Sequence, residues 1–120
     1  MTDEPTISFD AAEGGAVVTV RQSELTSRLT DLMLAEFARL KDAGRPVTLV
    51  VDLSNVKFID SVALGALVVL LRRVKKTDGA LGLVGLSGHV QRMFQVTSLD
   101  RVFDLYDSVA SALAAAKPAS

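Results

Sequence analysis

The sequence VTLVVDLSNVKFIDSVALG, residues 47–65, joins two different kinds of apolar segment. Val47–Val51 is short, continuous and rich in β-branched residues, which is typical of a strand covered on both faces of a sheet. Val62–Leu71 is almost wholly apolar and lies in a stretch that predicts a helix from Asp60 or Ser61 to about Lys76. A buried strand, a loop and then a helix indicate an α/β fold with parallel strands.

Two elements are predicted before this stretch. Ile7–Phe9 and Ala16–Val20 predict a β-hairpin at the N-terminus. Leu25–Leu40 has apolar residues at steps of three and four, which predicts an amphipathic helix with Leu32 on its apolar face. Ser23 is a candidate cap for the start of this helix.

Four further elements are predicted after the stretch, again alternating between strand and helix. They are a strand at Ala80–Leu86, a short helix from Ser87, a strand at Val102–Tyr106 and a helix capped by Asp107 or Ser108. We therefore expect one domain over residues 1–120, with a core at about 7–116 and a frayed tail at 117–120. Its fold class is α/β, with a mixed sheet of four or five strands, an N-terminal hairpin followed by parallel strands, and about four flanking helices.

The composition argues against several classes of function. The chain has no cysteine, which excludes a disulfide framework, a thiolate zinc site and a cysteine nucleophile. His89 is the only histidine and the carboxylates are scattered, so a Ser-His-Asp relay or a metal site has little support, and we expect His89 to be a surface or capping residue. Lys and Arg number 13 against 14 Asp and Glu, without the basic excess of a nucleic-acid-binding protein.

The sequence also predicts where the protein acts. Residues 62–71 form the longest apolar stretch, well short of the roughly 20 residues that span a membrane. The segment Met1–Pro5 is acidic and polar, unlike the start of a secretory signal. We expect a soluble, cytoplasmic protein with no membrane span.

Asp60 and Ser61 lie between the loop and the predicted helix, and two compatible roles follow. Serine is among the best N-cap residues, so Ser61 could simply begin the helix. A helix N-terminus also accommodates a phosphate, which would add about −1.5 to −2 charges beside Asp60. A partner covering the neighbouring apolar side chains would have to desolvate that charge, and a switch of this kind changes affinity by roughly 5–150-fold. Those side chains are Phe58, Ile59, Val62 and Leu64.

The loop after the predicted central strand carries Asp52, Ser54 and Asn55 in addition to Asp60. Sites in open α/β sheets form outside the carboxyl ends of the strands, where this loop is expected. Asp52 either bonds loop N–H groups and holds Ser61 in place, or stabilises only its own turn.

Taken together, these motifs resemble the STAS domain of bacterial anti-sigma-factor antagonists. The resemblance is centred on a D-L-S strand end followed by D-S-x-x-L-G and covers roughly Val47 to Leu113. The matching segments are Val50–Ser54, Phe58–Ser61, Leu64–Leu67, Arg72-Arg73, Leu81–Leu86, Val90–Met93 and Leu99–Phe103.

The resemblance implies a regulator without a cofactor, one that is a kinase substrate and not an enzyme. It implies that Ser61 is phosphorylated by an ATP-dependent serine kinase of the histidine-kinase-like type, which is also the anti-sigma factor. The unmodified antagonist would bind this kinase and free the sigma factor, and a serine phosphatase would reset it. Asp60 and Asp52 match the acidic residues of the family motif.

One position departs from the family pattern. Ala63 replaces the first glycine of D-S-x-G-L-G, which would place a methyl group within the expected partner interface of Phe58, Ile59, Val62, Ala63 and Leu64. Gly65 is retained, and we expect it to allow close packing of the helix on the sheet. The alternative function is a STAS subunit that binds its partner constitutively, for example in a lipid-transport complex, with Ser61 only a helix cap.

Overall fold

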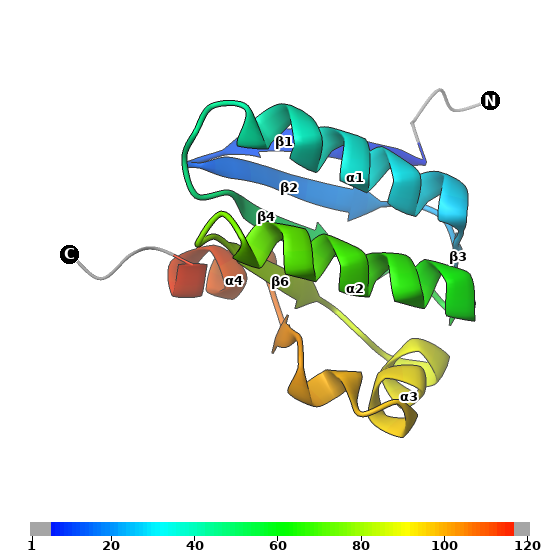
Figure 1. Ribbon diagram of the computed structural model, residues 1–120. Coiled ribbons are helices and arrows are strands. Elements are labelled where there is room, and N and C mark those ends of the chain that lie inside the picture. The colour runs from blue at the N-terminus through cyan, green and yellow to red at the C-terminus, as the bar shows by residue number, and fades with distance from the viewer. Residues whose placement is uncertain (1–5, 117–120) are drawn as a thin grey trace.

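The structure is a computed structural model that describes residues 6–116, and the expected frayed tail at 117–120 lies outside this range. Strands and helices alternate along the described chain after an initial hairpin (Figure 1). The elements are β1 (Ile7–Ala12), β2 (Gly15–Val20), β3 (Glu24–Leu25), α1 (Ser27–Lys41), β4 (Thr48–Asp52), β5 (Phe58–Ile59), α2 (Ser61–Lys75), β6 (Ala80–Val84), α3 (Gly88–Val96), a 3-10 helix (Leu99–Arg101), β7 (Asp104–Tyr106) and α4 (Val109–Ala116).

The main sheet has five strands in the order β1-β2-β4-β6-β7. Only the β1–β2 pair is antiparallel, and the remaining pairs are parallel. This arrangement confirms the predicted α/β class with a mixed sheet, an N-terminal hairpin and parallel later strands.

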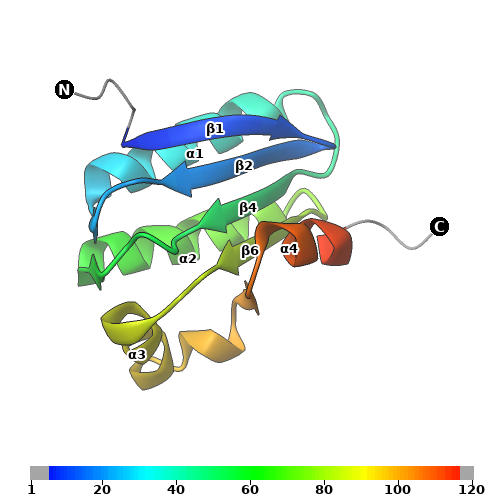
Figure 2. The same cartoon turned by 180° about the vertical axis from the view of Figure 1, so that it is seen from behind.

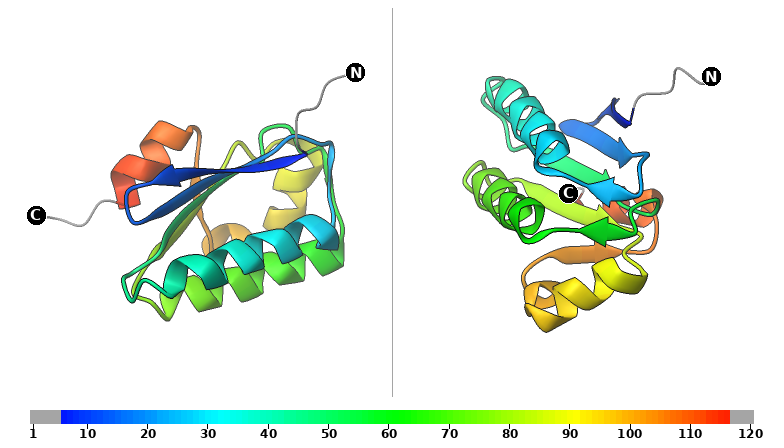
Figure 3. Two further views of the ribbon diagram at one scale, coloured as in Figure 1. Left: turned by 90° about the horizontal axis from the view of Figure 1, so that it is seen from above. Right: turned by 90° about the vertical axis from the view of Figure 1, so that its right-hand side faces the viewer.

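Strand β4 is the middle strand and is covered on both faces. Helices α1 and α2 lie side by side on one face of the sheet, and α4 lies on the other (Figures 2 and 3). Leu49 and Val51 belong to the larger core beneath α1 and α2, whereas Val50 packs with Ala112 of α4. Because successive side chains of a strand point to opposite faces, both sets must be apolar, which explains the consecutive aliphatic residues Leu49, Val50 and Val51.

The first helix differs from its prediction at its start and on its buried face. It begins at Ser27 with Thr26 as N-cap, so the expected cap at Ser23 is wrong. Leu32 is 40% exposed, so its expected place on the apolar face is also wrong. The buried residues are Leu29, Thr30, Met33 and Phe37. Steps of four keep Leu29, Met33 and Phe37 against the sheet, while Leu32 is turned about 100° away from Met33.

A second, two-stranded sheet was not predicted. Strand β3 pairs in parallel with β5, with Leu25 opposite Ile59 and both side chains buried. Each strand has only two residues, too few to show a sequence period. The carbonyl of Ser23 also accepts hydrogen bonds from the N–H groups of Lys57 and Phe58, at 2.7 and 3.0 Å. This small sheet therefore fixes the path of the chain immediately before α2.

Candidate protein-interaction site at the start of helix α2

Helix α2 is capped by Asp60. The Asp60 backbone is extended, and its carboxylate oxygen Oδ1 accepts a hydrogen bond from the N–H of Ala63 at 2.8 Å. Its carbonyl accepts the first helical bond, from the N–H of Leu64 at 3.0 Å. Of the two residues expected to begin the helix, Asp60 is the cap and Ser61 is the first helical residue. Capping by Ser61 is excluded because its backbone is already helical, whereas a cap residue is not.

The Ser61 side chain is exposed and is not needed by the helix. Its hydroxyl forms no hydrogen bond among residues 6–116. The helix does not need one, because the carboxylate of Asp60 already caps it. The N–H groups of Ser61 and Val62 lie in the first turn, where the helix itself offers no acceptor. The hydroxyl is thus accessible, at the positive end of the helix dipole and next to a carboxylate.

Two large apolar side chains flank Ser61 on the surface. Phe58 is 55% exposed and Val62 is 65% exposed. The other three residues of the expected interface, Ile59, Ala63 and Leu64, are buried in the core. The surface open to a partner is therefore smaller than the sequence indicated.

The burial of these three residues has a simple geometric cause. Ile59 alternates with Phe58 along β5 and so points inward. Ala63 and Leu64 lie on the side of α2 that faces the sheet, together with Leu67. The methyl group of Ala63, the residue that departs from the family pattern, is consequently in the core and adds nothing to the exposed surface.

Phe58 has a neighbour that sequence reasoning missed. The ring of His89, at the start of α3, lies 5.7 Å from the ring of Phe58 between centroids, with the planes tilted by 47°. Both side chains are exposed. The expectation of a surface histidine is consistent with this position, but no spacing in the sequence relates His89 to Phe58, because only the tertiary fold brings α3 beside β5.

The loop after β4 is stabilised locally. Oδ1 of Asp52 accepts hydrogen bonds from the N–H of Ser54 at 3.0 Å and from its hydroxyl at 2.7 Å. These bonds match the local-turn role considered for Asp52, and none joins Asp52, Ser54 or the exposed Asn55 to Ser61 within residues 6–116. The turn is closely packed, since a Cβ at Gly85 would lie 2.7 Å from Cβ of Ser54.

Gly65 has no packing role within the fold. It is exposed on α2, and a Cβ placed on it meets no atom within 4 Å. The expectation that Gly65 allows close helix–sheet packing is therefore wrong. Glycine inside a helix costs about 0.5–1 kcal/mol relative to alanine. No packing contact at this position among residues 6–116 offsets that cost.

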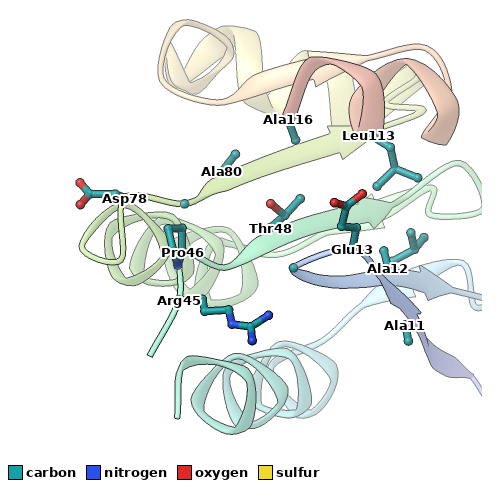
Figure 4. A pocket seen from close by; sticks show the side chains of 13 residues that line it. Ala11, Ala12, Glu13, Arg45, Pro46, Thr48, Asp78, Ala80, Leu113 and Ala116 are labelled. Carbon is teal, nitrogen blue, oxygen red and sulfur yellow. The ribbon is translucent and has the colours of Figure 1, made fainter. Parts of the chain in front are cut away.

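A cavity of about 730 Å³ lies at the other end of the sheet. Figure 4 shows that its walls come from the β1–β2 turn, the starts of β4 and β6, and α4. Thr48 and Ala80, the first residues of β4 and β6, line it, whereas Ser61 follows the carboxyl end of β4. Its lining is largely apolar, with Glu13, Arg45 and Asp78 as the charged members. The cavity is therefore separate from the exposed surface formed by Phe58, Ser61 and Val62, which we call the Ser61 surface.

The described part of the chain has neither a cluster of metal ligands nor a membrane-spanning helix. Residues 6–116 contain no group of three or more His, Cys, Asp or Glu side chains placed to hold a metal ion. None of the helices in that part of the chain has the length and apolar character needed to cross a bilayer.

Comparison with known proteins identifies the family. Residues 11–112 match the family model of the STAS domain, so the chain belongs to the STAS domain family. The resemblance recognised in the sequence is confirmed.

Two relatives and one solved structure that the chain resembles are described as anti-sigma-factor antagonists. The anti-sigma-B factor antagonist of Staphylococcus aureus strain NCTC 8325 is 35% identical over 91 residues, which are 76% of each chain. A Thermotoga neapolitana relative is 39% identical over 61 residues, and this match spans about half of each protein, 51% of this chain and 54% of the relative. The crystal structure of an anti-sigma factor antagonist from Mycobacterium paratuberculosis has a TM-score of 0.75 and 28% identity, and the alignment covers 94% of both chains.

Proposed function

We propose that this chain is an anti-sigma-factor antagonist whose partner binding is switched at Ser61. Unmodified, it binds an anti-sigma factor that is also an ATP-dependent serine kinase of the histidine-kinase-like type, and phosphorylation of Ser61 releases it. A serine phosphatase restores the binding form, and the cycle runs in the cytoplasm. The observation that carries the proposal is the exposed Ser61 hydroxyl, free of any capping role, between the exposed apolar side chains of Phe58 and Val62. The descriptions of the relatives support the class of function.

A phosphate on Ser61 would be compatible with the fold. The N–H groups of the first turn and the helix dipole favour negative charge there. Asp60 already occupies the N–H of Ala63, so the phosphate would use the donors of Ser61 and Val62. The modified chain should therefore remain folded.

The same phosphate would be costly beneath a partner. Arg72, the nearest cation along the exposed side of α2, is eleven residues from Ser61, or about 16 Å at 1.5 Å per residue. This separation exceeds the Debye length of about 8 Å at physiological ionic strength, so salt would screen the attraction and Arg72 would not neutralise the phosphate. The partner would have to cover two neighbouring anions, Asp60 and the phosphate, together with apolar Phe58 and Val62.

The first test is the modification itself. Protein isolated from its native cells under growth and under several stresses is measured by intact-mass spectrometry, with peptide mapping around residues 59–65. Part of the population should carry one phosphate, on Ser61.

The second test is the effect on binding. Wild type, Ser61→Ala and Ser61→Asp are titrated with the purified anti-sigma factor. Ser61→Ala should bind like the unmodified protein, and Ser61→Asp should bind roughly 5–150-fold more weakly with unchanged thermal unfolding. Ser27→Asp is the matched control, because Ser27 is the exposed first residue of α1 and the change adds the same charge at the same helical position. Absence of phosphate in every condition, with equal binding of all variants, would leave a constitutive interaction subunit in place of a switch.

A further inference from the structure

Strand β1 forms one edge of the main sheet and lacks most of the features that protect such edges. Free edges are commonly blunted by proline, lysine, a bulge or a covering element, because their unpaired backbone groups can bind another strand. Strand β1 has no proline or lysine, and its six residues pair with β2 in unbroken register. Figure 3 (left) looks onto this edge, where α1 lies to one side of β1. The edge is therefore open to a further strand.

The unpaired backbone groups belong to particular residues of β1. The N–H of Arg21 donates to the carbonyl of Thr6 at 2.7 Å, so these two residues form a hydrogen-bonded pair that continues the β1–β2 ladder. Along an antiparallel ladder such pairs alternate with pairs whose backbone groups point away from each other. The N–H and C=O groups that face the free edge are consequently those of Ile7, Phe9 and Ala11.

Two opposite charges lie beside this edge on one face of the strand. Arg21 donates a hydrogen bond to the hydroxyl of Ser8 at 2.6 Å, and Asp10 follows Ser8 on the same face. Asp10 and Arg21 are exposed and form no ion pair within residues 6–116, where the one salt bridge joins Glu36 and Arg39. A cation and an anion spaced along one strand complement the same strand running in the opposite direction.

We propose that the β1 edge pairs with the β1 edge of a second copy of this chain. The two strands run antiparallel about a two-fold axis at Phe9, and the two five-stranded sheets become one continuous sheet. Phe9 then faces Phe9, and Ile7 faces Ala11 of the second copy. Every free edge group of these residues meets a complementary group, because odd-numbered residues face odd-numbered residues throughout. The half-buried Phe9 rings also gain a contact across the axis.

The charges select this register over its neighbours. Ser8 faces Asp10 of the second copy, with Cβ atoms about 4.5–5.5 Å apart. The guanidinium of Arg21, already bonded to Ser8, is thereby brought to the carboxylate of the other chain. A register centred on Asp10 would set carboxylate against carboxylate, which is destabilising. A register centred on Ser8 would pair fewer residues of β1.

The pairing is compatible with binding at the Ser61 surface. That surface belongs to β5 and α2, whereas α1 is the helix nearer to β1 (Figure 1). A dimer joined at β1 therefore presents two open Ser61 surfaces. The inference does not depend on what binds there.

Sedimentation equilibrium of the purified chain tests the dimer. One pair of edge strands is a small interface, so we expect a weak dimer with a Kd of about 10–500 µM. Across about 10 µM to 2 mM protein, the average mass should rise from that of one chain toward that of two. The mass of a single chain at every concentration would overturn the proposal.

Substitutions test whether β1 is the edge that pairs. Ala11→Pro removes an N–H that the monomer does not use, so the chain should remain folded while dimerisation weakens at least about tenfold. Asp10→Arg and Arg21→Asp should each weaken it about fivefold or more, and the double variant should restore it to within about twofold. Asp100→Arg, an exposed carboxylate next to β7 at the other edge, is the control and should have no effect. A wild-type dimer in Ala11→Pro, or a double variant as weak as the single ones, would overturn the proposal.

Cysteine cross-linking tests the register, since the natural chain has no cysteine. Phe9→Cys places two thiols on directly opposite residues, whose Cα atoms lie about 5.5 Å apart, within the range of a disulfide. Diamide, which accepts the two electrons and two protons, should therefore link Phe9→Cys into a covalent dimer. Ala11→Cys, an exposed position four residues out of register with itself, should link at least about tenfold more slowly. Faster linking of Ala11→Cys than of Phe9→Cys would overturn the register.

Discussion

Asp60 and Ser61 are adjacent residues with separate tasks. The Asp60 carboxylate satisfies the N–H of Ala63, and the Ser61 hydroxyl is left free at the surface. If serine were the cap, phosphorylation would remove a bond that the helix needs. With aspartate as the cap, the helix start is independent of the modification. In the proposed switch, this division would let Asp60 hold the helix start while phosphorylation changes the charge of Ser61.

The division of tasks predicts a clear difference in stability. Asp60→Ala should lower the free energy of unfolding by about 0.5–2 kcal/mol because it removes the cap, and Asp60→Asn should lower it less because asparagine also caps well. Ser61→Ala should change it by less than about 0.5 kcal/mol, as is usual for exposed positions. Urea unfolding of the three variants measures this. An equal loss in Ser61→Ala and Asp60→Ala would show that Ser61 contributes to the helix start.

Ala63 illustrates how a position can be misjudged from a motif. Its methyl group is fully buried under α2, so the change from the family glycine alters the core and not the exposed surface. We expect Ala63→Gly to lower the free energy of unfolding by about 1 kcal/mol, through helix propensity and a lost buried methyl. Partner affinity should stay within about twofold of wild type. Calorimetric titration with the anti-sigma factor checks this, and a tenfold change in affinity would contradict it.

Helix α2 has two different faces. Ala63, Leu64, Leu67, Leu70, Leu71 and Val74 are buried against the sheet. The opposite side is also apolar over its first turns, which is why the sequence from residue 62 to 71 shows little polar interruption. Helix α1 lies beside it on the same face of the sheet and carries an ion pair between the half-buried Glu36 and the exposed Arg39.

The Glu36–Arg39 pair gives α1 a pH-dependent contribution. Arg39 donates hydrogen bonds to both carboxylate oxygens of Glu36, at 2.8 and 3.0 Å. Chiefly through this bonding, the pKa of Glu36 lies below its ordinary value of 4.5. A carboxyl whose pKa is lowered by folding stabilises the protein above the unfolded pKa and loses that effect as pH falls through the folded pKa.

Glu36→Gln should therefore lower the Tm by about 1–3 °C at pH 7, and by less below pH 4. High salt should also reduce the difference, because Arg39 is largely exposed and the pair is screened. Thermal unfolding of both proteins at pH 7 and pH 3.5, at low and high salt, tests the sign. A larger difference at the acidic pH would show that the pairing is not the cause.

The whole molecule is built around β4. This strand is bonded on both sides, to β2 and β6, and is covered on both faces. The Ser61 surface lies beyond the carboxyl ends of these strands, and is reached through the two-residue strands β3 and β5. The buried central strand thus forms a rigid scaffold, and the Ser61 surface lies at one end of it, next to a pair of strands with few hydrogen bonds. Binding sites are commonly placed in this way, on less stable segments positioned by a rigid scaffold.

Hydrogen exchange should reflect this layout. The amides of Val50 and Val51 should be among the slowest to exchange, since their opening requires global unfolding. The amides of residues 54–58 should exchange at least about tenfold faster, through local opening of the β3–β5 pair. Mass spectrometry of peptides covering the two segments measures this, and equal protection of both would contradict it. Added anti-sigma factor should slow exchange at residues 58–62 and leave Val50 unchanged.

Much of the architecture was predictable because it depends on patterns within a single element. The hairpin, the central strand, α2 and the alternation of later strands and helices each follow from the period of their own apolar residues. Two-residue strands such as β3 and β5 have no period to read. The exposed position of Leu32 could not be predicted, because Leu32 and Met33 both fit the spacing of three and four residues and the sequence does not show which of them faces the sheet.

The sequence by itself determined the α/β class, the central strand and an acidic–serine pair at the start of a helix, because side-chain periodicity and capping chemistry are local. Only the tertiary structure decided which residue of that pair caps the helix. It also decided that Phe58 and Val62 are exposed, whereas Ile59, Ala63 and Leu64 are buried. Gly65 proved to be exposed, without a packing contact. It also placed His89 against Phe58 across more than thirty residues of chain. The physical reason is that exposure and long-range contact depend on how elements pack against one another, and packing is a property of the assembled fold rather than of any one segment.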